Sequence, residues 1–158
     1  MKICLTPLEL KKIAQKIVSE ARELKNKYEI EPNAPVNYAC IFSQSEKEFQ
    51  VLLEAAEKSG KIIEQTRMGP LFQITPIPTV AGDLQLLKIR LPDKNRPERG
   101  DADFTLEHYL DFKSKCLTKP GFALIKKEKF EMIELADKNF NVLAYFSHPP
   151  LTEQFGLV

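Results

Sequence analysis

The sequence predicts an α+β fold in which two βαβββ modules form a curved mixed sheet with a cleft, preceded by an N-terminal amphipathic helix. The first observation is that the order strand, helix, strand, strand, strand occurs twice, with corresponding elements separated by roughly 60 to 65 positions. The second is that a periodic apolar stripe precedes the first copy. One helix per module cannot cover both faces of its strands, so we expect the two sheets to pair into a curved wall with a concave side.

The length of 158 residues fits one domain. A chain of this length buries a sufficient core without a disulfide or a structural metal. Sequence identity between the two modules is negligible, so the repeat is one of architecture. We divide the single domain, residues 1–158, into an N-terminal helix and linker (1–35), a first βαβββ module (36–92), a charged link (93–100), a second βαβββ module (101–150) and a tail (151–158).

Composition and charge argue against several classes of protein. Lys and Arg number 23 against 22 for Asp and Glu, and this near balance argues against a nucleic-acid-binding protein. No apolar run approaches the roughly 20 residues of a membrane helix, and the first residues do not form a signal peptide. Three widely spaced cysteines without a CxxC motif indicate free thiols and a cytoplasmic location: Cys4, Cys40 and Cys116.

The N-terminal helix is expected from about Pro7 to Tyr28. Thr6 can cap it, Pro7 suits its first position, and Glu9 completes a capping box. The apolar stripe favours packing on the protein's own domain, and a dimer surface is the alternative. Its residues are Leu10, Ile13, Ala14, Ile17, Ala21, Leu24 and Tyr28.

The elements of the first module follow a linker at 31–35. We expect a strand at 36–43, a helix that opens with a capping box at Ser45 and Glu48 and ends at Gly60, and strands at 61–68, 71–77 and 84–91. Gly69-Pro70 is expected to form a turn, and Pro76, Pro78 and Gly82 to interrupt the chain before residue 84.

The second module repeats this order after Gly100. We expect a strand at 101–105, a helix at 106–117 with Thr105 as its cap, and strands at 122–126, 130–135 and 141–147. The apolar tail is expected to dock onto the body of the domain.

Side chains alternate along a strand, so every second residue of three predicted strands faces the cleft. A guanidinium near two carboxyl groups could grip an anionic or zwitterionic ligand. The alternative is an ion pair between Arg90 and Asp103 that only joins the two modules. We also expect the charged link to be a solvated loop that can cover the cleft, with Arg99 contributing to it. The candidate ligand-binding residues are Tyr38, Cys40, Lys88, Arg90, Arg99, Asp101 and Asp103.

The paired βαβββ order resembles the vicinal oxygen chelate superfamily, which includes glyoxalase-like enzymes, extradiol dioxygenases and drug-sequestering proteins. The leading helix, the strand VNYACIF, the strand LKIRLP and the charged link look closest to its YecM-type, metal-poor branch, over roughly Pro7 to Pro150. The resemblance implies metal-ligand positions on the first and last strands of each module. These hold Tyr38 and Arg90, then Asp103 (or Asp101) and Ala144 or Tyr145.

One carboxylate, one tyrosine and one arginine do not form a metal site, because a guanidinium cannot be a ligand. The two histidines, His108 and His148, are too separated for a zinc motif. The sequence places no histidine near Cys40 that could activate its thiol for nucleophilic catalysis. We therefore expect no metal and no cofactor, and catalytic residues stay unknown.

The sequence favours metal-independent binding of a small anionic or zwitterionic molecule in the cleft. A first alternative is an enzyme of the same superfamily, of lyase, isomerase or dioxygenase type, that uses Asp103 or Glu107 as a base or recruits a metal. A second is a protein interaction module that docks a partner on the N-terminal helix or an edge strand. We expect no nucleic-acid or membrane partner, and a homodimer remains open.

Overall fold

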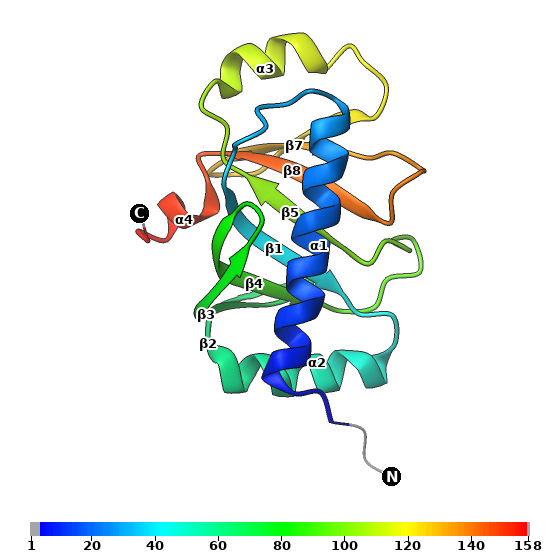
Figure 1. Cartoon of the computed structure of the whole chain (residues 1–158), viewed down its shortest axis with the longest axis vertical. Coiled ribbons are helices and arrows are strands. Elements are labelled where there is room, and N and C mark those ends of the chain that lie inside the picture. The colour runs from blue at the N-terminus through cyan, green and yellow to red at the C-terminus, as the bar shows by residue number, and fades with distance from the viewer. Residues whose placement is uncertain (1–3, 158) are drawn as a thin grey trace.

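The computed structural model describes residues 4–157 and contains one mixed sheet of eight strands with four helices (Figure 1). The sheet order is β2-β3-β4-β1-β5-β8-β7-β6. The elements are α1 (Pro7–Lys27), β1 (Val36–Phe42), α2 (Glu46–Ser59), β2 (Gly60–Thr66), β3 (Gly69–Thr79), β4 (Gly82–Arg90), β5 (Gly100–Phe104), α3 (Tyr109–Cys116), β6 (Phe122–Lys126), β7 (Glu131–Leu135), β8 (Val142–His148) and α4 (Leu151–Gln154).

The two modules meet at the centre of the sheet, where β1 and β5 pair antiparallel with Cys40 opposite Asp101. In each module the first strand pairs parallel with the last, β1 with β4 and β5 with β8, and the remaining strands follow outward in hairpins. This arrangement confirms the predicted α+β fold with its curved mixed sheet and leading helix.

Helix α1 lies along one face of the sheet, and α2 lies beside its N-terminal end (Figure 1). The apolar stripe of α1 is buried against β1, β5 and β8, so packing of this helix on its own domain is confirmed. The predicted capping box is present, since Thr6 Oγ1 accepts from Glu9 N and Glu9 Oε2 accepts from Thr6 N. Alternate residues of the central strands complete this core: Ala39, Ile41, Leu87, Ile89, Ala102 and Phe104.

The predicted turn at Gly69-Pro70 is wrong, because β3 already begins at Gly69 and the turn lies at residues 67–68. Gly69 has φ 139°, and a Cβ there would lie 2.0 Å from the Ile89 carbonyl oxygen, so only glycine fits. Pro76 and Pro78 do not interrupt the chain. Strand β3 continues through them because its register with β4 shifts between Gln73 and Ile77, and a bulge tolerates a residue without an N–H group.

The start of the second-module helix also differs from the sequence prediction. Helix α3 begins at Tyr109 instead of residue 106, and Thr105 does not cap it. The Glu31 carboxylate, from the linker before β1, accepts the N–H groups of Glu107 (2.7 Å) and His108 (3.1 Å). A distant side chain therefore satisfies the donors that precede this helix. Among the described residues, no helix is long and apolar enough to cross a membrane.

A buried lysine fixes the end of α1 to the linker. The Lys25 side chain is fully buried, and its Nζ donates to the carbonyl oxygens of Ile30 (3.0 Å) and Glu31 (2.7 Å) and to Asn26 Oδ1 (2.7 Å). The same ammonium lies 5.5 Å from the ring centre of Phe104, on β5. Burial lowers the pKa of Lys25 to about 8. The first helix is thereby joined to the chain that enters the sheet.

Replacing Lys25 by methionine is expected to lower the free energy of unfolding by about 2 to 4 kcal/mol, because two buried carbonyl groups lose their donor. Urea unfolding followed by circular dichroism measures the change. The control is Lys16→Met, on the same helix, whose exposed ammonium lies 3.9 Å from Glu20 Oε1. An exposed pair contributes less than about 1 kcal/mol. Equal losses in the two variants would contradict the role assigned to Lys25.

Candidate functional site

The sheet face opposite α1 forms a cleft of about 450 Å³, within the range of small-molecule sites. Its lining comes from both modules. The first module contributes side chains of β1, β2, β3 and β4, and the second contributes those of β5, β6, β7 and β8. The apolar part of its floor belongs to a second core cluster, separate from the one under α1: Tyr38, Cys40, Phe42, Leu71, Leu86, Met132, Leu143 and Tyr145.

One row of side chains crosses the middle of the cleft floor. The strand registers place Lys88 of β4 opposite Cys40 of β1, and Cys40 opposite Asp101 of β5. All three line the cleft, as alternation along the strands predicts. The row thus brings a cation and a carboxyl group to the same face, with a thiol between them.

Asp101 is the most unusual group of the cleft. Its side chain is 4% exposed, and its Oδ1 has no hydrogen-bond partner. Burial, and secondarily the neighbouring carboxyl of Asp103, raise the pKa of Asp101 well above the ordinary value of an aspartate. A buried polar atom without a partner costs about 1 to 3 kcal/mol. The cleft floor therefore holds a carboxyl group whose hydrogen-bonding capacity the described side chains leave unused.

Two arginines stand at the side of the cleft where β4 ends. The Arg90 guanidinium lies 4.8 Å from the ring centre of Phe42, and its Nη2 lies 3.0 Å from Asp93 Oδ2. Arg96, in the charged link, donates to Glu134 Oε2 at 3.2 Å, and the same oxygen accepts from the Tyr145 hydroxyl. The aromatic ring and these hydrogen bonds fix the direction of each guanidinium.

The opposite wall consists of the tip of the β6–β7 hairpin and the C-terminal helix. The tip contributes Lys127, Glu128, Lys129 and Phe130, and α4 and the residue after it contribute Leu151, Gln154 and Phe155. The tail thus docks on the body, as expected. None of these residues, nor Arg96, was a candidate from the sequence. Only the repeat could have indicated them. The β2–β3 hairpin tip of the first module, with Thr66 and Met68, lines the cleft, and the β6–β7 tip is its counterpart in the second module.

Asp103 faces the same side of the sheet as Asp101 but does not line the cleft. It is fully buried and accepts hydrogen bonds from Asn37 Nδ2 (2.8 Å), Ser147 N (3.0 Å) and Ser147 Oγ. Burial raises the pKa of Asp103 to about 6, and these hydrogen bonds oppose the rise. The predicted ion pair between Arg90 and Asp103 is therefore wrong, because each group has other partners.

Arg99 also lies away from the cleft lining. Its Nη1 donates to Glu48 Oε1 (2.7 Å) and to the Phe42 carbonyl oxygen (3.1 Å), which joins the charged link to α2. The predicted capping box of α2 is accordingly only half formed. Ser45 Oγ accepts from Glu48 N, while the Glu48 carboxylate turns to Arg99 and to Gln44 N.

The thiol and the phenol of the cleft floor are neutral groups. Burial raises the pKa of Cys40 and that of Tyr38 well above their ordinary values. A thiol that retains its proton is a poor nucleophile. Cys40 and Tyr38 therefore shape the floor and offer uncharged contacts to a ligand.

The positions that the resemblance assigns to metal ligands do not suit a divalent ion. Arg90 is a cation, the Tyr145 hydroxyl donates a hydrogen bond to Glu134, and Ala144 packs on the α1 side of the sheet. Within residues 4–157, no three His, Cys, Asp or Glu side chains lie close enough to share a metal. His148 stacks on Tyr109, with ring centres 4.5 Å apart. This donor set does not fit a metal centre, so we derive no chemistry through one.

Comparison with known proteins supports the fold. No family model matches the chain, and no curated protein matches it. A solved structure described as "Structural Genomics, Protein EC4020" is similar. The superposition has a TM-score of 0.71, covers 99% of this chain and 97% of that chain, and the aligned residues are 9% identical. At this identity the likeness concerns the fold alone.

Proposed function

We propose that the protein binds a small anionic or zwitterionic molecule in the cleft, without a metal ion. The single observation that carries this proposal is Asp101, a buried carboxyl group that lines a cleft and has an unpartnered oxygen. Basic side chains outnumber acidic ones in the same lining, which favours an anionic group on the ligand. The basic residues are Lys88, Arg90, Arg96, Lys127 and Lys129, and the acidic ones are Glu64, Asp101 and Glu128.

We also propose that the chain is a metal-poor relative of the vicinal oxygen chelate superfamily. The paired βαβββ order supports this proposal, as does the cleft on the face away from α1. The unpaired thiols of Cys4, Cys40 and Cys116 fit a cytoplasmic protein. Docking of a partner on the apolar stripe of α1 is not proposed, since that stripe is already buried in the domain.

Binding of an anionic probe tests the proposed cleft. Anilinonaphthalene sulfonate combines an apolar body with a sulfonate, so we expect it to bind the wild-type protein with increased fluorescence. The Arg90→Gln variant is expected to bind it about tenfold more weakly, because loss of one charge-assisted contact removes about 1.4 kcal/mol. A fluorescence titration at low salt measures both dissociation constants.

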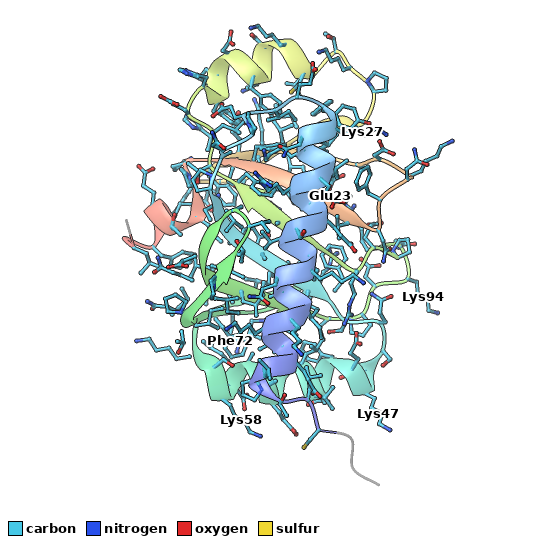
Figure 2. The ribbon with its side chains drawn as sticks, viewed as in Figure 1. Glu23, Lys27, Lys47, Lys58, Phe72 and Lys94 are labelled. Carbon is cyan, nitrogen blue, oxygen red and sulfur yellow. The ribbon has the colours of Figure 1, made fainter. Side chains whose placement is uncertain are left out.

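Two controls accompany this titration. Lys47→Gln removes a cation from the outer side of α2 (Figure 2) and should leave binding within about twofold. Asp93→Asn removes the ion-pair partner of Arg90 while keeping the guanidinium, so it separates loss of the cation from loss of the pair. Equal affinity of wild type and Arg90→Gln for the probe would overturn the proposal.

A further inference from the structure

We propose that the ligand is a zwitterion with an apolar body, of the size of an apolar amino acid. Its ammonium group would contact Asp101, and its carboxylate would contact Lys88 and Arg90. This inference rests on the proposed function and narrows the class of ligand. Three features of the cleft carry it.

The first feature is that Asp101 needs donors that the protein does not provide. Its neighbours across the strands are Cys40 and Leu143. The Cys40 thiol points its weak donor to the Ile41 carbonyl oxygen at 3.9 Å, and Leu143 has no polar side-chain atom. An ammonium group carries three N–H donors and a positive charge, so beside this cleft-lining carboxyl group it supplies donors that the protein does not and compensates the negative charge.

The second feature is the separation of the anion-binding cations from Asp101. Lys88 lies two strands from Asp101, with Cys40 between them. Neighbouring strands are about 4.8 Å apart, which places the two Cα atoms about 10 Å from each other. Within residues 4–157, Lys88 forms no ion pair. A molecule with adjacent ammonium and carboxylate groups fits between two such side chains, with each charge facing its opposite.

The third feature is the apolar surface beyond these charges. Leu71 and Met132 form part of the floor, Phe130 stands at the hairpin tip, and Leu151 and Phe155 close the C-terminal wall. A purely polar zwitterion would leave this surface in contact with water. A hydrocarbon or aromatic side chain on the ligand would bury it, and apolar burial contributes about 25 cal/mol per Å².

Matched compounds test the inference. Phenylalanine and leucine are compared with their deaminated acids (phenylpropionate and methylpentanoate) and their decarboxylated amines (phenethylamine and isopentylamine). At least one zwitterion is expected to bind at least tenfold more tightly than both of its relatives, measured by isothermal titration calorimetry at pH 7. Asp101→Asn should abolish the preference over the deaminated acid, and Arg90→Gln should abolish the preference over the amine.

Proton release gives a second readout. An ammonium group beside Asp101 favours the ionised form of the carboxyl group, so binding of the zwitterion should release up to one proton from Asp101. Titrations in Bis-Tris and in Tris, which are not anions and whose ionisation heats differ, measure this release, and Asp101→Asn should eliminate it. Lys47→Gln should match the wild type in every titration.

The outcomes separate this inference from the proposed function. If the deaminated acids bind as tightly as the zwitterions, or if binding takes up a proton, the zwitterion class is wrong while the anion-binding cleft stands. If none of the six compounds binds or displaces anilinonaphthalene sulfonate, the inference is overturned, and Arg90-dependent binding of that probe still supports the cleft. Probe binding that does not depend on Arg90 overturns both.

Discussion

Replacing Asp101 by asparagine is expected to increase the free energy of unfolding at pH 7 by about 1 to 3 kcal/mol. The side chain is buried, its Oδ1 lacks a partner, and its pKa is raised well above the ordinary value. Each unit of such an increase costs about 1.4 kcal/mol once the pH exceeds the raised pKa. Asparagine has the same shape and no charge, so it removes this cost.

The pH dependence of the unfolding free energy shows whether the raised pKa of Asp101 causes this difference. A carboxyl group with a raised pKa in the folded protein binds its proton more tightly than in the unfolded chain. Its contribution to stability is therefore complete below about pH 4, the pKa of an unfolded aspartate, and is lost as the pH rises through the folded-state pKa. Wild type and Asp101→Asn should have similar stability at pH 4, and the advantage of the variant should grow toward pH 7.

Urea unfolding at several pH values between 4 and 7, followed by circular dichroism, measures this difference. Asp83→Asn is the matched control, since Asp83 also lies on a strand and is exposed. It should change the unfolding free energy by less than about 0.5 kcal/mol at any pH. A less stable Asp101→Asn variant would mean that Asp101 makes contacts which hold the fold together, contrary to the orphaned oxygen seen in the structure.

A residue that lowers stability where it stands is retained for another reason, and binding is the common one. The substitution that stabilises the fold should also weaken binding of the ligand, because the ligand's N–H donors lose the carboxylate that accepts them. Opposite effects of one substitution on stability and on binding are therefore the signature of the proposed site.

The sequence could predict the cleft floor because side chains on a strand alternate with a period of two. Once the central strands are assigned, alternation places Tyr38, Cys40, Lys88, Arg90 and Asp101 on one face, and all five line the cleft. The fold was predictable for a related reason, since the order of the elements repeats and only a few arrangements cover such sheets.

The cleft walls could not be predicted in this way. Arg96 enters the wall because it reaches Glu134, 38 positions further along the chain, and the loop that carries it has no period. Lys127 and Phe130 line the cleft because the two hairpin tips curve over the same face. Curvature is a property of the assembled sheet, so local patterns do not reveal it.

The different roles of Asp101 and Asp103 could not be predicted from the sequence either. They lie two residues apart on the same strand and face the same side, so alternation gives them equal status. What distinguishes them is the residues around them on β1 and β8. Asp103 pairs with Tyr38 and Tyr145 across the strands and accepts hydrogen bonds from Asn37 and Ser147 of the same two strands. Asp101 pairs with Cys40 and Leu143, and its Oδ1 has no partner. Their roles separate only after the registers of β1 and β8 are known.

Asp103→Ala is accordingly expected to lower the free energy of unfolding by about 2 to 4 kcal/mol, in contrast to Asp101→Asn. The substitution removes one of the two acceptors of Asn37 Nδ2 (the other is Thr105 Oγ1) and the acceptor of both Ser147 donors, and the Ser147 N–H is then buried without a partner. The Asn37 amide also holds the start of α4, because its Oδ1 accepts from Leu151 N at 3.2 Å. The C-terminal wall of the cleft should therefore loosen together with the strands.

Asparagine at position 103 supplies the decisive comparison. Asn37 Nδ2 and Ser147 N both donate to the same carboxyl oxygen, Oδ1, and an amide oxygen can accept both. The amide nitrogen can donate to Ser147 Oγ, whose hydroxyl rotates to accept it. We therefore expect Asp103→Asn to remain within about 1 kcal/mol of the wild type at pH 7, while Asp103→Ala does not.

Denaturant unfolding of the two variants, with hydrogen exchange of the α4 amides, tests this assignment. Burial raises the pKa of Asp103 to about 6, so its contribution to stability falls as the pH rises from about 4 through 6, and this fall should be absent in Asp103→Asn. Equal losses in the alanine and asparagine variants would show that charge, and not the hydrogen-bond acceptor, is what Asp103 provides. Faster exchange at Leu151 only in the alanine variant would show that the acceptor is what holds the wall of the cleft in place.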